Sequence, residues 1–149
     1  MRILLAIDDS KFSEAATQAV ISQILPNNTE VLVLHVLNLV PFYFTNAMAP
    51  THTSLLDTIL EDERNAAQAL VTLTEKTLRS AGFKATSTVR EGDPKSAIID
   101  FAAEWHADLI VLGSHGRKAV DRFMLGSVSE SVARHARCSV EIVRLPSRH

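Results

Sequence analysis

The chain lacks the sequence features of exported and membrane-spanning proteins. It has 149 residues and a single cysteine, Cys138, so no intrachain disulfide can form and a reducing compartment is expected. No window approaches the roughly 20 consecutive apolar residues of a membrane helix. The first residues do not have the pattern of a secretory signal. We therefore expect a cytoplasmic protein with no membrane partner.

The chain also lacks an excess of charge of either sign. The formal net charge is −2, with 46% hydrophobic and 21% charged residues, which is ordinary for a globular protein. Such a balance gives no field that would attract nucleic acid. Neither an internal repeat nor a low-complexity tract divides the chain, and its length is typical of one domain. We predict one domain over residues 1–149 and no nucleic-acid partner.

Signatures of catalysis are missing as well. The chain has no Gly-x4-Gly-Lys-(Ser/Thr) loop, so it lacks the lysine that reaches the β- and γ-phosphates in many nucleotide hydrolases. Six histidines are spread along the chain without a metal-ligand spacing, so no metal site is expected from the protein alone. These absences predict no catalytic residues and leave open whether the chain is an enzyme.

Five short runs rich in Val, Ile and Leu are present and predict strands. The runs are almost continuously apolar, which favours a parallel sheet covered on both faces. Segments with helical spacing alternate with them, so we predict an α/β fold with a doubly wound sheet and right-handed crossovers. The predicted strands are Arg2–Ile7, Val31–Leu37, Lys84–Arg90, Asp108–Leu112 and Ser139–Val143.

Capping residues mark several helix ends. Asp93-Pro94 opens one helix, and Gly82 ends the long helix before it. The last helix is expected to open at Ser127, because Ser127 and Glu130 match a capping box. One long stretch, Asn38–Ser54, is expected to be irregular, and it either packs near a ligand or moves freely. The long helix that Gly82 ends is marked by residues at helical spacing, which are Leu56, Ile59, Leu60, Glu63, Ala67, Leu70 and Leu73.

Glycine is scarce, yet three of the five glycines fall within residues 113–126, between the fourth strand and the last helix. Glycine permits a positive φ and a close ligand approach. A helix N-terminus adds free amides and a positive dipole end, so Gly126–Ser127 is a favourable place for a phosphate. The cationic side chains of Arg117, Lys118 and Arg122 could assist, and His115 either contacts a phosphate or faces solvent. The alternative is a plain connection whose glycines serve turns.

Gly113, Gly116, Gly126 and Ser127 fill the pattern Gly-x2-Gly-x9-Gly-(Ser/Thr) without a gap. With this motif and the segments Ile3–Ser10, Leu34–Val36 and Cys138–Val143, the whole chain resembles the ATP-binding subgroup of the universal stress protein family. The resemblance implies a flavodoxin-like five-stranded sheet of order 3-2-1-4-5, with helices on both faces, and a homodimer. Asp9 departs from the small residue or glycine that many members have there.

The resemblance also implies ATP, with or without Mg²⁺, as the ligand, with Asp8 and Val36 near the adenine and ribose. In the order 3-2-1-4-5, Asp8 and Gly113 end neighbouring strands at the switch point where doubly wound sheets bind ligands. The expected ATP-binding residues are Ala6, Ile7, Asp8, Val36, Gly113, Ser114, His115, Gly116, Arg117, Gly126, Ser127 and Val128.

We therefore expect a nucleotide-dependent regulatory or stress-response protein whose state an unidentified protein partner reads. Two alternatives stay open: a slow ATPase switch, and an interaction module in which the loop is a vestige. The acidic pair Asp8-Asp9 also suggests a phospho-receiver domain. That class requires an aspartate ending the third strand and a lysine ending the fifth, and the chain has neither.

The last strand is an edge strand in this order, and its apolar run would be open to pairing. We expect a homodimer through Ser139–Val143, in which a two-fold axis perpendicular to the sheet pairs the strand with its own copy, antiparallel. Ile142 opposite its own copy is one allowed register. The alternative is a monomer whose edge is covered by the C-terminal tail or by Asn38–Ser54.

Overall fold

The chain folds into a five-stranded parallel sheet. This computed structural model describes residues 1–46, 53–116 and 124–145. The strand order is β3-β2-β1-β4-β5, and every neighbouring pair is parallel, as the resemblance implies. The strands are β1 (Arg2–Ala6), β2 (Glu30–Leu37), β3 (Lys84–Glu91), β4 (Leu109–Gly113) and β5 (Ser139–Val143). The predicted strands are thus confirmed within one residue at each end.

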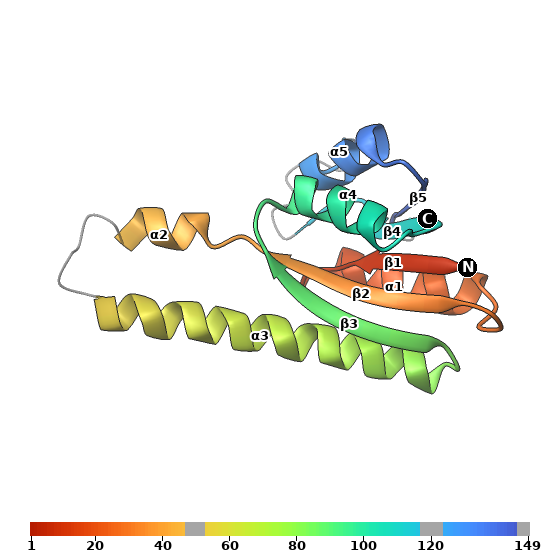
Figure 1. The fold of residues 1–149 in the computed structure, drawn as a ribbon, viewed down its shortest axis with the longest axis horizontal. Coiled ribbons are helices and arrows are strands. Elements are labelled where there is room, and N and C mark those ends of the chain that lie inside the picture. Colours follow the sequence, from red (N-terminus) through yellow and green to blue (C-terminus); the bar gives the residue numbers. More distant parts are fainter. Residues whose placement is uncertain (47–52, 117–123, 146–149) are drawn as a thin grey trace.

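Helices cover both faces of the sheet. They are α1 (Lys11–Gln23), α2 (Val40–Asn46), α3 (Thr53–Ser80), α4 (Pro94–Glu104) and α5 (Ser127–His135). Helices α1 and α3 pack on one face, and α4 and α5 pack on the other (Figure 1). Helix α2 and the first turns of α3 project beyond the ends of the strands (Figure 1).

The alternation of side chains in the central strands explains their apolar sequence. In β1, Ile3 and Leu5 belong to the core under α1 and α3, whereas Leu4 and Ala6 belong to the core under α4 and α5. Successive residues of a strand face opposite sides, so a strand covered on both faces must be apolar at every position. None of the residues Ile3 to Leu5 is exposed at all.

Local hydrogen bonds fix where the helices begin and end. The side chain of Ser10 caps α1 by accepting from the amide of Ser13, and Asp93 caps α4 by accepting from the amide of Ser96. Gly82 follows α3 with φ of 95°, a conformation that glycine adopts without strain. The Asp93-Pro94 start and the Gly82 end are confirmed.

The expectation of one irregular stretch over Asn38–Ser54 is wrong in part. Helix α2 forms within it, and α3 already begins at Thr53; residues 47–52 lie outside the described part of the chain. The Asn38 side chain accepts a hydrogen bond from the Val40 amide at 3.2 Å, and Pro41 falls in the first turn, where proline is tolerated. Phe42 packs with the buried residues Leu39 and Leu60. The short helix is therefore held by contacts with α3.

The length and hydropathy of the helices were compared with those of membrane-spanning helices. Across residues 1–46, 53–116 and 124–145, none combines the length and apolar character needed to cross a bilayer.

Candidate functional site

The main cavity opens at the carboxyl edge of the sheet. Its volume is about 510 Å³, and residues that follow β1, β2 and β4 line it. Strands β1 and β4 are neighbours in register, with Ala6 beside Leu112. The helices that follow these two strands lie on opposite faces of the sheet, so the cavity sits at the switch point of the fold.

Most of the residues expected to bind ATP lie around this one cavity. The lining includes Ala6, Ile7, Asp8, Val36, Gly113, His115, Gly116, Gly126, Ser127 and Val128. Ser114 is not part of the lining: it is only 2% exposed, and its carbonyl accepts from the Gly126 amide at 2.8 Å. Arg117, Lys118 and Arg122 lie outside the described residues.

The carboxylate of Asp8 is held in place by the start of α1. Its Oδ1 accepts from the Ser10 amide and from the Ser13 hydroxyl, each at 2.9 Å. The Ser13 hydroxyl in turn accepts from the amide of Asp8 at 2.8 Å. The Oδ2 atom is the one nearest to Gly116. The carboxylate is therefore pre-positioned at the cavity wall, with one oxygen engaged by the protein.

The three loop glycines are needed because other atoms of the protein lie close to their Cα atoms, not because the backbone is left-handed there. None has φ in the positive range, which among the described glycines occurs only at Gly82 and Gly92. A Cβ on Gly113 would lie 2.7 Å from the Cβ of Phe12, and one on Gly126 would lie 3.2 Å from the Ser114 carbonyl oxygen. The positive φ that glycine permits is therefore not adopted at these three positions.

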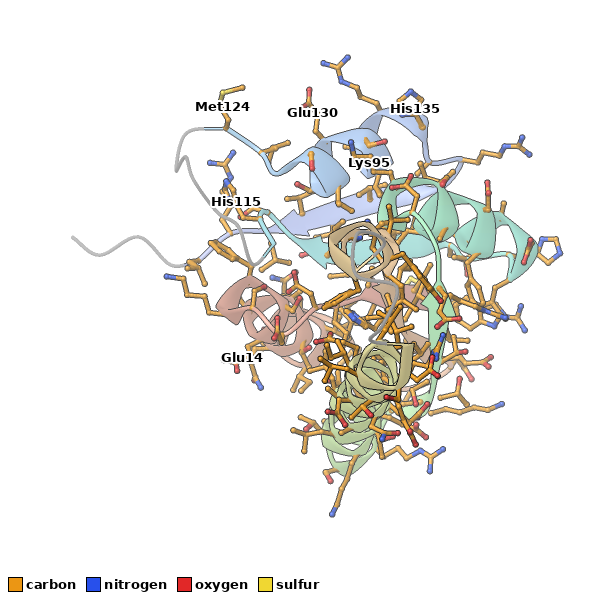
Figure 2. All side chains as sticks on the ribbon, turned by 90° about the vertical axis from the view of Figure 1, so that its left-hand side faces the viewer. Glu14, Lys95, His115, Met124, Glu130 and His135 are labelled. Atoms are coloured by element: carbon orange, nitrogen blue, oxygen red, sulfur yellow. The ribbon has the colours of Figure 1, made fainter. Side chains whose placement is uncertain are left out.

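His115 connects the two described ends of the loop. Its Nε2–H donates to the carbonyl of Met124, and its Nδ1 lies 2.9 Å from the hydroxyl of Ser114. The ring also contacts Phe12, with 5.1 Å between ring centroids. Figure 2 shows His115 and Met124 close together on one side of the molecule. Both ring nitrogens are thus engaged by the protein, which neither of the two readings of His115 from sequence included.

Helix α5 begins at the cavity with no side-chain cap. The capping residue is Gly126, with extended φ and ψ, so the expectation of Ser127 as cap is wrong. The reason is that the Gly126 carbonyl accepts the first helical hydrogen bond, from Glu130 at 2.9 Å, which places Ser127 inside the helix. Glu130 pairs with Arg134 at 3.0 Å. The amides of Ser127 to Ser129 precede that first bond, so they are the donors that favour an anion.

Several lining residues were not identified from the sequence. They come from elements outside the motif: Asn38, Pro41 and Phe42 near α2, Glu63 of α3, and Pro94 and Ile98 of α4. The stretch Asn38–Ser54 was expected either to pack near a ligand or to move freely, and its residues Asn38, Pro41 and Phe42 line the cavity. Glu63 also carried a signal, because it interrupts the apolar stripe of its helix. His35 lines the cavity too, and its Nδ1–H donates to the carbonyl of Ile7 at 2.7 Å, joining the ends of β1 and β2.

The remaining reactive groups do not form a second centre in the described residues. Burial raises the pKa of the Cys138 thiol, which disfavours the nucleophilic thiolate. Among residues 1–46, 53–116 and 124–145, no three His, Cys, Asp or Glu side chains are grouped so that they could hold a metal ion.

A doubly wound parallel sheet with a glycine-rich loop and a cavity at its switch point defines a class of α/β ligand-binding domains. The model of the universal stress protein family matches residues 1–144. The chain belongs to the universal stress protein family. It is 31% identical over 147 residues to the universal stress protein MJ0531 of Methanocaldococcus jannaschii, covering 99% of this chain and 84% of the relative.

Solved structures share the fold. The hypothetical protein MJ0577 superposes with a TM-score of 0.86 at 24% identity, over 99% of this chain and 97% of that one. A universal stress protein in complex with cAMP has a TM-score of 0.69 at 21% identity, over 96% of each chain. A family protein of Arabidopsis thaliana with AMP bound has a TM-score of 0.66 at 18% identity, over 99% and 93%.

Proposed function

We propose that this chain binds an adenine nucleotide, ATP foremost, in the cavity at the switch point and acts as a nucleotide-dependent regulatory protein in a stress response. The observation that carries the proposal is the start of α5, where uncapped amides and the loop glycines meet the same cavity as Asp8 and Val36. The structures of family proteins with cAMP and AMP support an adenine nucleotide as the ligand. A cytoplasmic location is part of the proposal.

The two ends of the cavity suit the two ends of a nucleotide. The amides at Ser127 and Val128 suit phosphate oxygens, because they lie at the positive end of the α5 dipole. Val36 is 8% exposed and offers an apolar wall to a base, and Asp8 offers an acceptor to ribose hydroxyls. Mg²⁺ would enter with the phosphates of ATP, whose oxygens are the ligands it prefers.

Replacing Ser127 by proline tests the role of the helix start. Proline at the first helical position is well tolerated, and Gly126 already has the extended φ and ψ, −62° and 156°, that a residue before proline requires. Ser127→Pro therefore removes one amide donor while the helix stays intact. We expect calorimetry to show at least about tenfold weaker ATP binding, as for a lost hydrogen bond to a charged group. Ser127→Ala, the matched control, keeps the amide and should bind much closer to wild type.

The same titrations test the ligand. ATP, ADP, AMP and GTP, each with and without Mg²⁺, should show a preference for adenine and a gain from the additional phosphates. Mass spectrometry of small molecules released from the heat-denatured protein would reveal a co-purified nucleotide. No binding to the folded protein at millimolar ATP would contradict the proposal and favour an interaction module with a vestigial loop.

Slow hydrolysis is the second candidate function. The described residues include no lysine at the cavity wall, so we expect negligible turnover, far below the 1–10³ per second that is common for enzymes. Single-turnover assays with Mg²⁺ and ATP measure this rate. Turnover near one per second that disappears in Ser127→Pro would show that the protein is an enzyme.

A homodimer through β5 is also part of the proposal. Within the described residues β5 pairs only with β4, and the Val143 carbonyl accepts from the Ser114 amide at 2.8 Å. Since successive residues direct their polar groups to opposite sides, the amide of Ile142 faces the open edge. Ile142→Pro therefore removes a donor from that edge and spares the pairing with β4. Analytical ultracentrifugation should show dimeric wild type and Ile142→Val but monomeric Ile142→Pro. A monomeric wild type at tens of micromolar would contradict this assembly.

A further inference from the structure

Glu63 of α3 occupies a position where the helix is otherwise apolar. Leu60, three residues earlier, and Ala67, four residues later, are each only 4% exposed. Residues three and four apart share one face of a helix, so Glu63 lies on the face that packs toward Leu37 and Leu39. It is half-buried and lines the main cavity. A carboxylate there loses hydration that an apolar residue would not lose.

The Glu63 carboxylate has no hydrogen-bond or ion-pair partner within residues 1–46, 53–116 and 124–145. The adjacent cation, Arg64, is directed to Glu91, with 2.6 Å between its Nε and a carboxylate oxygen. The other carboxylate of the lining, Asp8, is already held by Ser10 and Ser13. A half-buried acid without a partner in a cavity wall is well placed to accept a hydrogen bond from a ligand.

The fold places Glu63 at the end of the cavity away from α5. Helix α3 packs over β2 and β3, whereas α5 packs on the opposite face near β4 and β5 (Figure 1). Strands β2 and β4 flank β1, which separates them by about 10 Å at the usual strand spacing. A phosphate repels a carboxylate, so a nucleotide with its phosphates at Ser127 must direct its other end, the base, toward β2 and α3.

We propose that the carboxylate of Glu63 accepts a hydrogen bond from the exocyclic 6-amino group of the base and so selects 6-amino purines over 6-oxo purines. The inference rests on the proposed nucleotide binding and adds which group reads the base. A carboxylate only accepts hydrogen bonds, so it matches the amino group of adenine and opposes the carbonyl oxygen of hypoxanthine. The amide of glutamine can donate or accept, so it can face either group.

The test measures the affinities of ATP, ITP and purine riboside 5′-triphosphate for wild type, Glu63→Gln and Glu61→Gln. Glu61 is exposed and is not part of the cavity lining, so its variant controls for the change in net charge. Wild type and Glu61→Gln should bind ATP about tenfold or more tightly than they bind either of the other two nucleotides, as expected for one hydrogen bond to a charged group. In Glu63→Gln the preference should fall to within about threefold, with the melting temperature of the ligand-free protein not lowered.

Three results would overturn the inference. The ratio of ITP to ATP affinity could be the same in Glu63→Gln as in wild type. That result would be compatible with nucleotide binding but would show that Glu63 does not recognise the base. Glu63→Gln could instead change only the discrimination between ATP and 2′-deoxy-ATP, which would place the carboxylate at the ribose. If wild type bound none of these nucleotides, the proposed function itself would fail, and the base preference with it.

Discussion

Two glycines of the loop are predicted to have different roles: Gly113 in packing and Gly116 in ligand binding. A Cβ on Gly113 meets the Phe12 Cβ at 2.7 Å and the Phe12 backbone carbonyl carbon at 2.8 Å, so β4 and α1 would have to move apart. We expect Gly113→Ala to lower the free energy of unfolding by about 1–3 kcal/mol, as overpacking does. A Cβ on Gly116 meets only the Asp8 Oδ2, at 3.0 Å. Gly116→Ala should therefore spare stability and weaken ATP binding.

Urea unfolding of the ligand-free variants, followed by calorimetry with ATP, separates the two effects. Gly113 is required by packing whether or not a ligand is bound, so a larger residue at this position does not by itself test phosphate binding. Equal stability of Gly113→Ala and wild type would contradict the packing argument.

His115 is predicted to hold the start of α5 in position. His115→Ala removes the donor to the Met124 carbonyl, the contact with Ser114 and the ring contact with Phe12. We expect faster hydrogen exchange of the two hydrogen-bonded amides of this segment, those of Gly126 and Glu130, by about tenfold, together with weaker ATP binding, since one hydrogen bond is worth about 1 kcal/mol. His115→Gln can donate to Met124 and should recover part of both properties.

His135→Ala is the control, because within the described part of the chain the His135 ring is hydrogen-bonded to the Ser131 carbonyl of its own helix, at 2.9 Å from Nδ1, and not to the loop. Hydrogen exchange measured by mass spectrometry on peptides from the start of α5 tests the prediction. Unchanged exchange in His115→Ala would mean that the loop is held by other contacts.

At the scale of the element, the start of α5 is anchored by Ser129 rather than by Ser127. The Ser129 hydroxyl is buried at 2% exposure and donates to the Ser114 carbonyl at 2.8 Å. Ser129→Ala leaves the rest of the helix unchanged but removes this link to β4, so we expect a loss of about 1 kcal/mol in unfolding free energy. Ser127 makes no cap, so Ser127→Ala should change stability by less than about 0.5 kcal/mol.

Thermal or urea unfolding without ligand measures both serine variants. If Ser127→Ala lost as much stability as a removed cap, about 1 kcal/mol, the assignment of Gly126 as the capping residue would be contradicted.

At the scale of the whole molecule, one domain with a ligand site between its strand ends should unfold as one unit. The cavity is lined from β1, β2, β4 and all five helices, so unfolding any part would release the ligand. We expect a single transition by fluorescence and circular dichroism. ATP at 100 times its dissociation constant should raise the free energy of unfolding by about 2.7 kcal/mol.

The ATP-dependent rise in the free energy of unfolding should be smaller in Ser127→Pro at the same ATP concentration, because that variant binds ATP more weakly. Two separate transitions would contradict a single domain over residues 1–149. A full rise in Ser127→Pro would mean that ATP binds elsewhere.

The sequence by itself determined the five strands, the helices that alternate with them and the place of the loop, but not α2. Central strands covered on both faces must be apolar at every position, so their runs stand out without any knowledge of the fold. Caps such as Asp93 and terminators such as Gly82 act on their own neighbours, and their signals are therefore local. The strand order came from the family resemblance, because the alternation of elements alone leaves the order of a doubly wound sheet open.

Tertiary contacts decided what each residue of the site does. Helix α2 forms because Phe42 packs with Leu39 and Leu60, a contact that composition does not reveal. The need for glycine at Gly113 arises from Phe12, about a hundred residues away in the chain, and the place of Glu63 arises from the packing of α3 over β2. Local patterns record which backbone a segment prefers, whereas these roles depend on distances between segments, and only the folded chain sets those distances.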